Sequence, residues 1–175
     1  MKLVAAARPE LDEYGGPFAN YVALVPEERI LEVLENQLGE LLAVLRPLDE
    51  AEALTLHAPY TWTIKEVVGH VTDCERIFAY RALRAARGDA TPLAGFDENE
   101  YARHAHFSTY QHRELVSELE HVRQASLWLF RHLDDAAWLR RGTAAGVVLS
   151  VRAWAYIITG HARHHLTILR RRLRQ

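Results

Sequence analysis

The sequence of 175 residues contains a single cysteine, Cys74. One cysteine excludes an intramolecular disulfide and a zinc site built from several thiolates. The sequence also lacks a long hydrophobic run: none approaches the roughly 20 apolar residues that a membrane helix requires. Near the start, the apolar stretch of residues 3–7 is too short for a secretory signal peptide. We therefore expect a cytoplasmic protein without a membrane segment.

An excess of charge of either sign is missing as well, since the formal net charge is −2 with neutral histidines. Such a chain has no general attraction for nucleic acid or anionic lipid, and we expect neither as a partner. The hydrophobic fraction of 49% is ordinary for a globular protein. The length suits a single domain over residues 1–175, large enough to bury a core without disulfides or a structural metal.

Apolar residues recur at helical spacing in four segments. These segments cover residues 27–46, 63–87, 108–133 and 150–173. Thr63 with Glu66, and Ser108 with Gln111, each fit a capping box at a helix start, and Ser150 fits an N-cap. No credible series of strands is present. The pattern predicts an all-α fold, a four-helix bundle.

The segments between the predicted helices are long, at about 15 to 20 residues each. They leave room for a non-sequential order of helices around the core. Residues 1–25 are rich in proline and glycine and indicate an irregular N-terminal arm. Residues 88–107 form a long polar connection, and loops of this length in a small domain often have a function, such as the rim or lid of a site.

Histidine is abundant in this sequence, with ten residues. In the last predicted helix Trp154, Ile158, His161, His165 and Ile168 follow a four-three spacing, the period of a buried seam. His161 and His165 lie on one face, one turn apart, as do the two histidines of the H-E-x-x-H zinc helix. No glutamate follows His161, so that metalloprotease motif is excluded.

His70 occupies a similar place in the second predicted helix, on a stripe with Val67, Cys74 and Ile77. A single interior histidine is more often a hydrogen-bonded core residue than a ligand, whereas a buried pair without a partner is costly. If the two helices pack together, His70 faces His161 and His165. Three neutral imidazoles would hold one divalent metal ion and leave a coordination position open. We expect zinc or nickel first, with iron, manganese or copper as alternatives.

Other residues are candidates for the surroundings of this site. Asp73 is placed to accept a hydrogen bond from a metal-bound histidine, although a capping or salt-bridge role is an equal alternative. Glu66, Tyr101 and His104 are further candidates for the pocket. For Cys74 we favour a buried, inert thiol over a metal ligand.

Three segments together resemble the DinB-like (YfiT-like) superfamily. They read WTIKEVVGHVTDCERIFAYRALRAARGD, PLAGFDENEY and GHARHHLTIL. The resemblance covers most of the chain and implies a four-helix bundle, a homodimer, and a metal site with His70, His161 and His165 as ligands. Family members of known activity are mostly transferases and isomerases that use bacillithiol, mycothiol or glutathione, and others are described as metal-dependent hydrolases.

The leading hypothesis is therefore a metal-dependent enzyme acting on a small molecule, as a thiol-dependent transferase or a hydrolase. The metal would lower the pKa of a water, or activate the thiolate of a low-molecular-weight thiol. The alternative is a non-catalytic metal-binding module of a stress response or of regulation. In that case a loop carboxylate such as Asp97, Glu98 or Glu100 would close the coordination sphere.

Overall fold

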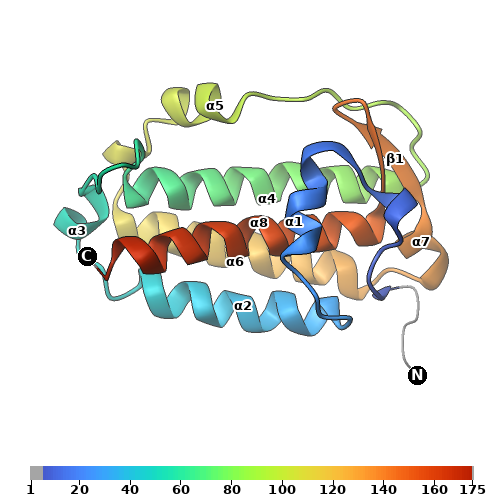
Figure 1. Cartoon of the computed structure of the whole chain (residues 1–175), viewed down its shortest axis with the longest axis horizontal. Coiled ribbons are helices and arrows are strands. Elements are labelled where there is room, and N and C mark those ends of the chain that lie inside the picture. Colours follow the sequence, from blue (N-terminus) through green and yellow to red (C-terminus); the bar gives the residue numbers. More distant parts are fainter. Residues whose placement is uncertain (1–5, 175) are drawn as a thin grey trace.

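The computed structural model describes residues 6–174, and four long helices run along its longest axis (Figure 1). They are α2 (Ile30–Leu45), α4 (Ile64–Ala86), α6 (His112–Arg131) and α8 (Val151–Arg172). Neighbouring pairs are α4 with α8, α4 with α6, α2 with α6 and α2 with α8. The predicted four-helix bundle is confirmed. Its order around the core is non-sequential, and this order places α4 directly beside α8.

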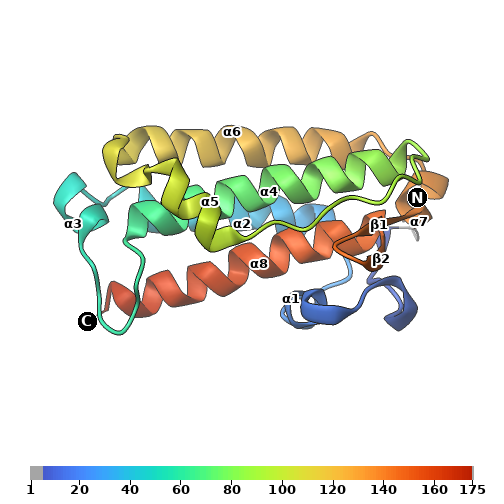
Figure 2. The same cartoon turned by 90° about the horizontal axis from the view of Figure 1, so that it is seen from above.

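Shorter helices and one β-hairpin connect the four long helices or precede them. They are α1 (Ala19–Ala23), α3 (Glu50–Leu54), α5 (Glu98–Ala105) and α7 (Asp135–Leu139), three 3-10 turns at Leu11–Glu13, Gly16–Phe18 and Phe107–Thr109, and the antiparallel strands β1 (Arg141–Ala144) and β2 (Val147–Ser150). Figure 2 shows α1 lying along α8 and α5 lying over α4. The predicted irregular arm thus includes a helix, and its residues 1–5 lie outside the described part. None of the described helices is long and apolar enough to cross a membrane.

Local capping signals explain two of the long helices. Thr63 and Glu66 form both halves of the predicted box at the start of α4, with the Thr63 N–H donating to Glu66 Oε2 at 2.7 Å. Ser150 Oγ accepts from the N–H of Ala153 at 3.0 Å and caps α8. Both predicted caps are confirmed, and each lies at the start of a helix that carries a histidine of the cluster.

The box predicted at Ser108 and Gln111 is wrong. Ser108 lies in a separate 3-10 turn, and α6 begins only at His112, with no side-chain bond from Gln111. The reason is tertiary: Glu50 accepts a hydrogen bond from the His112 N–H at 2.6 Å and takes the place of a local cap. The first bundle helix likewise begins at Ile30 rather than at residue 27.

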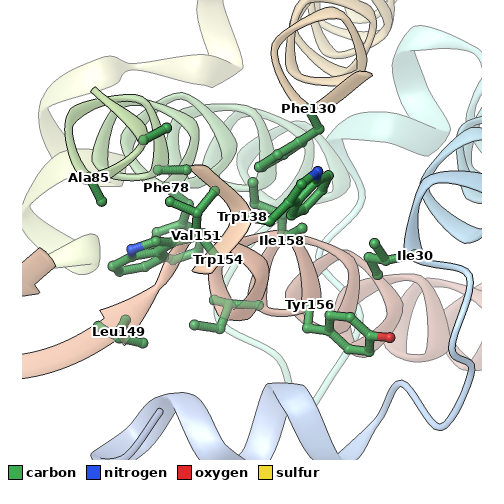
Figure 3. Close-up of a cluster of buried hydrophobic side chains, with 14 of the residues drawn as sticks. Ile30, Phe78, Ala85, Phe130, Trp138, Leu149, Val151, Trp154, Tyr156 and Ile158 are labelled. Atoms are coloured by element: carbon green, nitrogen blue, oxygen red, sulfur yellow. The ribbon is translucent and has the colours of Figure 1, made fainter. Parts of the chain in front are cut away.

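The hydrophobic core consists of two clusters arranged along the bundle. One contains Trp138, Trp154 and Phe130 (Figure 3), and the other contains Val68 and Leu166. Along α4 and α8, the boundary between the two hydrophobic clusters lies near His70 and His161. The core therefore continues on both sides of the histidine layer and holds α4 and α8 in fixed register there.

A buried polar network crosses the bundle. Arg123 of α6 donates to Glu75 of α4 at 2.7 and 2.9 Å and to Gln37 of α2 at 3.0 Å. Gln37 in turn donates to the carbonyl of Thr159 in α8 at 2.9 Å. One network thus connects all four long helices, and it ends two residues from His161.

Candidate metal centre

His70 of α4 and the pair His161 and His165 of α8 point into the same space. His70 and His161 are buried, and His165 is half-buried. The Nε2 atoms of His70 and His161 are 3.0 Å apart, and one nitrogen from each of the three rings lies within 4.8 Å of the others. The structure therefore brings together the three histidines that helical periodicity selected.

The spacing of His70 and His161 fits two ligands of one metal ion. Two nitrogen ligands with metal–nitrogen bonds of roughly 2.0–2.1 Å are separated by about 2.9–3.4 Å in tetrahedral or octahedral coordination. The 3.0 Å between His70 and His161 falls in that range. Within the described residues, no carboxylate belongs to the cluster, so three imidazoles are its whole ligand set.

The protonation state also suits metal binding, which requires neutral imidazole. Burial lowers the pKa of His70 to about 4 and that of His165 to about 3, with neighbouring histidines adding to the effect. Burial, followed by the proximity of His165 and His70, holds the pKa of His161 well below its usual range. All three rings are neutral at pH 7 and offer lone pairs without competition from protons.

Aromatic side chains pack on two of the three rings, those of His70 and His161. Trp62, just before α4, packs on His70 with ring centroids 4.8 Å apart. Tyr21 of α1 packs edge-on against His161 at 5.2 Å, and Phe78 does so at 5.7 Å. These contacts fix the ring orientations and keep bulk water away from one side of the centre.

Cys74 lies one turn beyond His70, with its Sγ 3.6 Å from His70 Nδ1. Burial raises the pKa of this thiol to about 12, so it is neutral at any physiological pH. A neutral thiol is a poor ligand and a poor nucleophile. Its position supports the interpretation of Cys74 as a buried, inert thiol.

A cavity of about 370 Å³ leads to the histidines. Its walls come from α1 and the turn before it, from α4 and α8, and from the segment that precedes α5. That segment is held by the hairpin: Leu93 exchanges backbone hydrogen bonds with Thr143 at 2.9 Å and Ala145 at 3.0 Å. The hairpin, which the sequence did not predict, therefore positions Phe96 and Glu98 at the cavity.

The model of the DinB superfamily matches residues 34–169, a range that contains all three histidines. The chain belongs to the DinB superfamily. The predicted resemblance is thereby confirmed for most of the sequence. No curated protein sequence matches the chain.

Two solved structures are similar in fold to this chain. YfiT from Bacillus subtilis, described as a probable metal-dependent hydrolase with an unusual four-helix bundle topology, has a TM-score of 0.74 at 19% identity, covering 83% of this chain and 86% of that one. The mycothiol-dependent maleylpyruvate isomerase has a TM-score of 0.71 at 20% identity, covering 85% of this chain and 62% of that one. This chain therefore spans less than two thirds of the isomerase.

The structure does not bring four further sequence candidates to the centre. Asp73 pairs with Arg76 at 3.3 Å, the salt bridge that the sequence left open, and Glu66 is engaged in its capping box. Tyr101 and His104 lie on α5 with exposed side chains, because α5 directs Glu98 and Asn99 toward the cavity instead.

Sequence reasoning missed Tyr21 and Trp62. Both stand outside the long helices, so helical periodicity carries no signal for them. Gly160 is the one sequence feature that relates to Tyr21, because an ideal Cβ at position 160 would lie 2.0 Å from the Tyr21 carbonyl oxygen. This buried glycine, next to His161 in sequence, marks the place where α1 packs against α8.

Proposed function

We propose that this member of the DinB superfamily is a metal-dependent enzyme acting on a small molecule, as a thiol-dependent transferase or as a hydrolase. One observation supports the proposal: three neutral imidazoles, two buried and one half-buried, converge in the wall of a cavity of about 370 Å³. Small-molecule sites are typically concave, largely apolar, and provided with a few convergent polar groups.

His70, His161 and His165 would hold the ion. When bound, a divalent ion supplies a Lewis acid that lowers the pKa of a water or a thiol. The residues of the chain have separate tasks. Trp62 and Tyr21 keep the imidazoles in place, and the exposed carboxylate of Glu98 at the cavity is available to accept a proton.

A thiol reaction would need a thiol from outside the chain. Cys74 is the sole cysteine, and burial raises its pKa to about 12. The nucleophile would therefore be a low-molecular-weight thiol. The fold shared with an isomerase described as mycothiol-dependent supports this choice.

The non-catalytic alternative requires a carboxylate that closes the coordination sphere. Of Asp97, Glu98 and Glu100, Glu98 lines the cavity, yet the ligand cluster found among the described residues contains imidazoles only. A cavity that reaches an incompletely surrounded metal position favours an enzyme over a sealed metal store or sensor.

The test combines metal content with turnover. Protein purified without a histidine tag is analysed for bound metal, then loaded with zinc or nickel and incubated with small thiols and a panel of electrophiles and esters. We expect one metal per chain and turnover that His161→Ala abolishes. His121→Ala, an exposed histidine on α6, is the matched control. A fully loaded protein without turnover on any substrate class would support the non-catalytic alternative.

A further inference from the structure

Among the described residues, four arginines have buried positions. They are Arg81, Arg123, Arg152 and Arg172. Two of them are neutralised by a buried carboxylate: Arg123 pairs with Glu75, and Arg152 pairs with Glu13. These pairs show the arrangement that a buried guanidinium usually needs, because an unpaired charge in the interior is costly.

Arg81 is different. It is only 5% exposed, and in residues 6–174 no carboxylate forms an ion pair with it. It donates a hydrogen bond to the carbonyl of Ala94 at 2.7 Å, and its guanidinium lies over the rings of Phe96 and Trp154 at 5.6 and 5.5 Å. Aromatic faces attract a cation but do not neutralise it.

The side chain of Arg81 lines the cavity of the metal centre. Arg172 lacks a carboxylate as well, but it donates to the Thr55 carbonyl and to the His57 ring and does not line this cavity. Arg81 is therefore the buried arginine that a negatively charged ligand in the cavity can neutralise.

The distance to the histidines suits a small ligand. Arg81 follows His70 on α4, and helical side chains lean toward the N-terminus, so the guanidinium leans back toward the metal centre. It lies over Trp154, which precedes His161 by seven residues, or about 10 Å along a helix axis. Phe78 lies between, with its ring 5.6 Å from Trp154 and 5.7 Å from His161.

We propose that Arg81 binds the carboxylate of a small organic acid whose apolar part lies against Phe78 and whose reactive end reaches the three imidazoles. This inference rests on the proposed function, since it assigns a substrate class to the same site. It names a specificity residue on α4 that acts by pairing with the substrate's charge.

The composition of the cavity wall favours a carboxylate over a phosphate. In the described chain, Arg81 is the only arginine of the wall and no lysine contributes to it, while Glu98 adds a negative charge. In the metal-free protein, one guanidinium balances a singly charged carboxylate, whereas a phosphate dianion would remain undercompensated in a cavity whose wall also carries Glu98.

The experiment measures the binding of simple acids by calorimetry. Benzoate and phenylacetate are compared with benzamide, phenylacetamide and inorganic phosphate, on metal-free and on zinc-loaded protein. We expect the acids to bind and the neutral amides and phosphate to bind much more weakly. Arg81→Gln should weaken the acids by about 10- to 100-fold, the worth of a charge-assisted hydrogen bond. Arg87→Gln, at an exposed arginine of the same region, should leave the affinity unchanged.

The outcomes separate the two proposals. His165→Ala removes a proposed metal ligand, so acid binding in this variant tests Arg81 without the metal. If the protein binds no metal but Arg81→Gln still loses acid affinity, the proposed function fails and the anion site stands. Equal affinity of wild type and Arg81→Gln for the acids, or a preference of the metal-free protein for phosphate, would overturn the carboxylate site even with an intact metal centre.

Circular dichroism and thermal unfolding establish whether Arg81→Gln is folded. Arg81→Lys is the second variant, because it keeps the charge but loses the planar fork that matches a carboxylate. We expect it to bind the acids several-fold more weakly than wild type. Unchanged acid affinity in both Arg81→Gln and Arg81→Lys would show that Arg81 does not contact the ligand.

Discussion

The backbone of Tyr21 packs against Gly160 so closely that an ideal Cβ at position 160 would lie 2.0 Å from the Tyr21 carbonyl oxygen. This contact holds α1 on α8 and places the Tyr21 ring on His161. A methyl group cannot be accommodated unless α1 moves. The contact therefore couples the packing of a short peripheral helix to the geometry of the metal centre.

We expect Gly160→Ala to lower the free energy of unfolding by about 1–3 kcal/mol, as overpacking in a core does. It should also weaken metal binding, because Tyr21 would leave His161. Gly39→Ala in α2 is the control: nothing lies within 4 Å of its added Cβ, and it should be neutral or stabilise by about 0.4–1 kcal/mol. Urea unfolding and a metal titration check both values. If Gly160→Ala behaves like Gly39→Ala, α1 does not press on α8.

Buried neutral histidines predict a dependence of stability on pH in the metal-free protein. The folded pKa of His70 is lowered to about 4 and that of His165 to about 3, mainly by burial, while the unfolded value is about 6.5. Below pH 6.5 the unfolded chain binds more protons than the folded chain, so stability falls as the pH falls. The loss begins near pH 6.5 and continues toward the folded pKa values.

Each such histidine contributes at most about 1.4 kcal/mol per pH unit in this window. Urea unfolding of metal-stripped protein between pH 7 and pH 5 measures the slope before most carboxylates titrate. His70→Gln should make the slope shallower, whereas His121→Gln, at an exposed position, should not. A wild-type stability that is flat across this range would show that the rings are not buried in the neutral form.

Periodicity predicted the histidine set because all three residues lie within long helices, where a buried stripe is visible in the sequence. His161 and His165 follow the seam of α8, and His70 follows that of α4. The bundle order then brings these seams together. The arrangement of the four helices around the core could not be predicted in the same way. Long connections permit a non-sequential arrangement, but loop length does not specify which helices become neighbours.

The rest of the site depends on contacts that are distant in sequence. The start of α6 at His112 is fixed by Glu50, some sixty residues away, so the local pattern at Ser108 was misleading. The hairpin escaped prediction because its strands have four residues each and turn at Ala145 and Gly146, both with positive φ, without the Asn-Gly signal typical of such turns.

The buried ion pair of Arg123 and Glu75 predicts that replacing one partner destabilises the protein more than replacing both. Arg123→Met leaves the Glu75 carboxylate buried without a partner and should cost about 3–5 kcal/mol of unfolding free energy. Replacing both residues, in Arg123→Met with Glu75→Leu, should restore much of this loss, because no buried charge remains. Arg46→Met, which breaks the exposed pair with Glu120, should cost about 1 kcal/mol or less. A double variant less stable than the single variant would contradict this view of the network.

Metal binding should stabilise the bundle without being required for it. The two hydrophobic clusters lie on both sides of the histidine layer, so we expect metal-free protein and His161→Ala to keep their helical circular dichroism. A ligand present at about 100 times its Kd adds about 2.7 kcal/mol to the free energy of unfolding. Zinc should therefore raise the Tm of the wild type and of His164→Ala, which changes an exposed neighbour outside the ligand cluster. The same addition should leave the Tm of His161→Ala unchanged, because two imidazoles remain where the site needs three. A zinc-dependent shift that survives in His161→Ala would place the metal elsewhere on the chain.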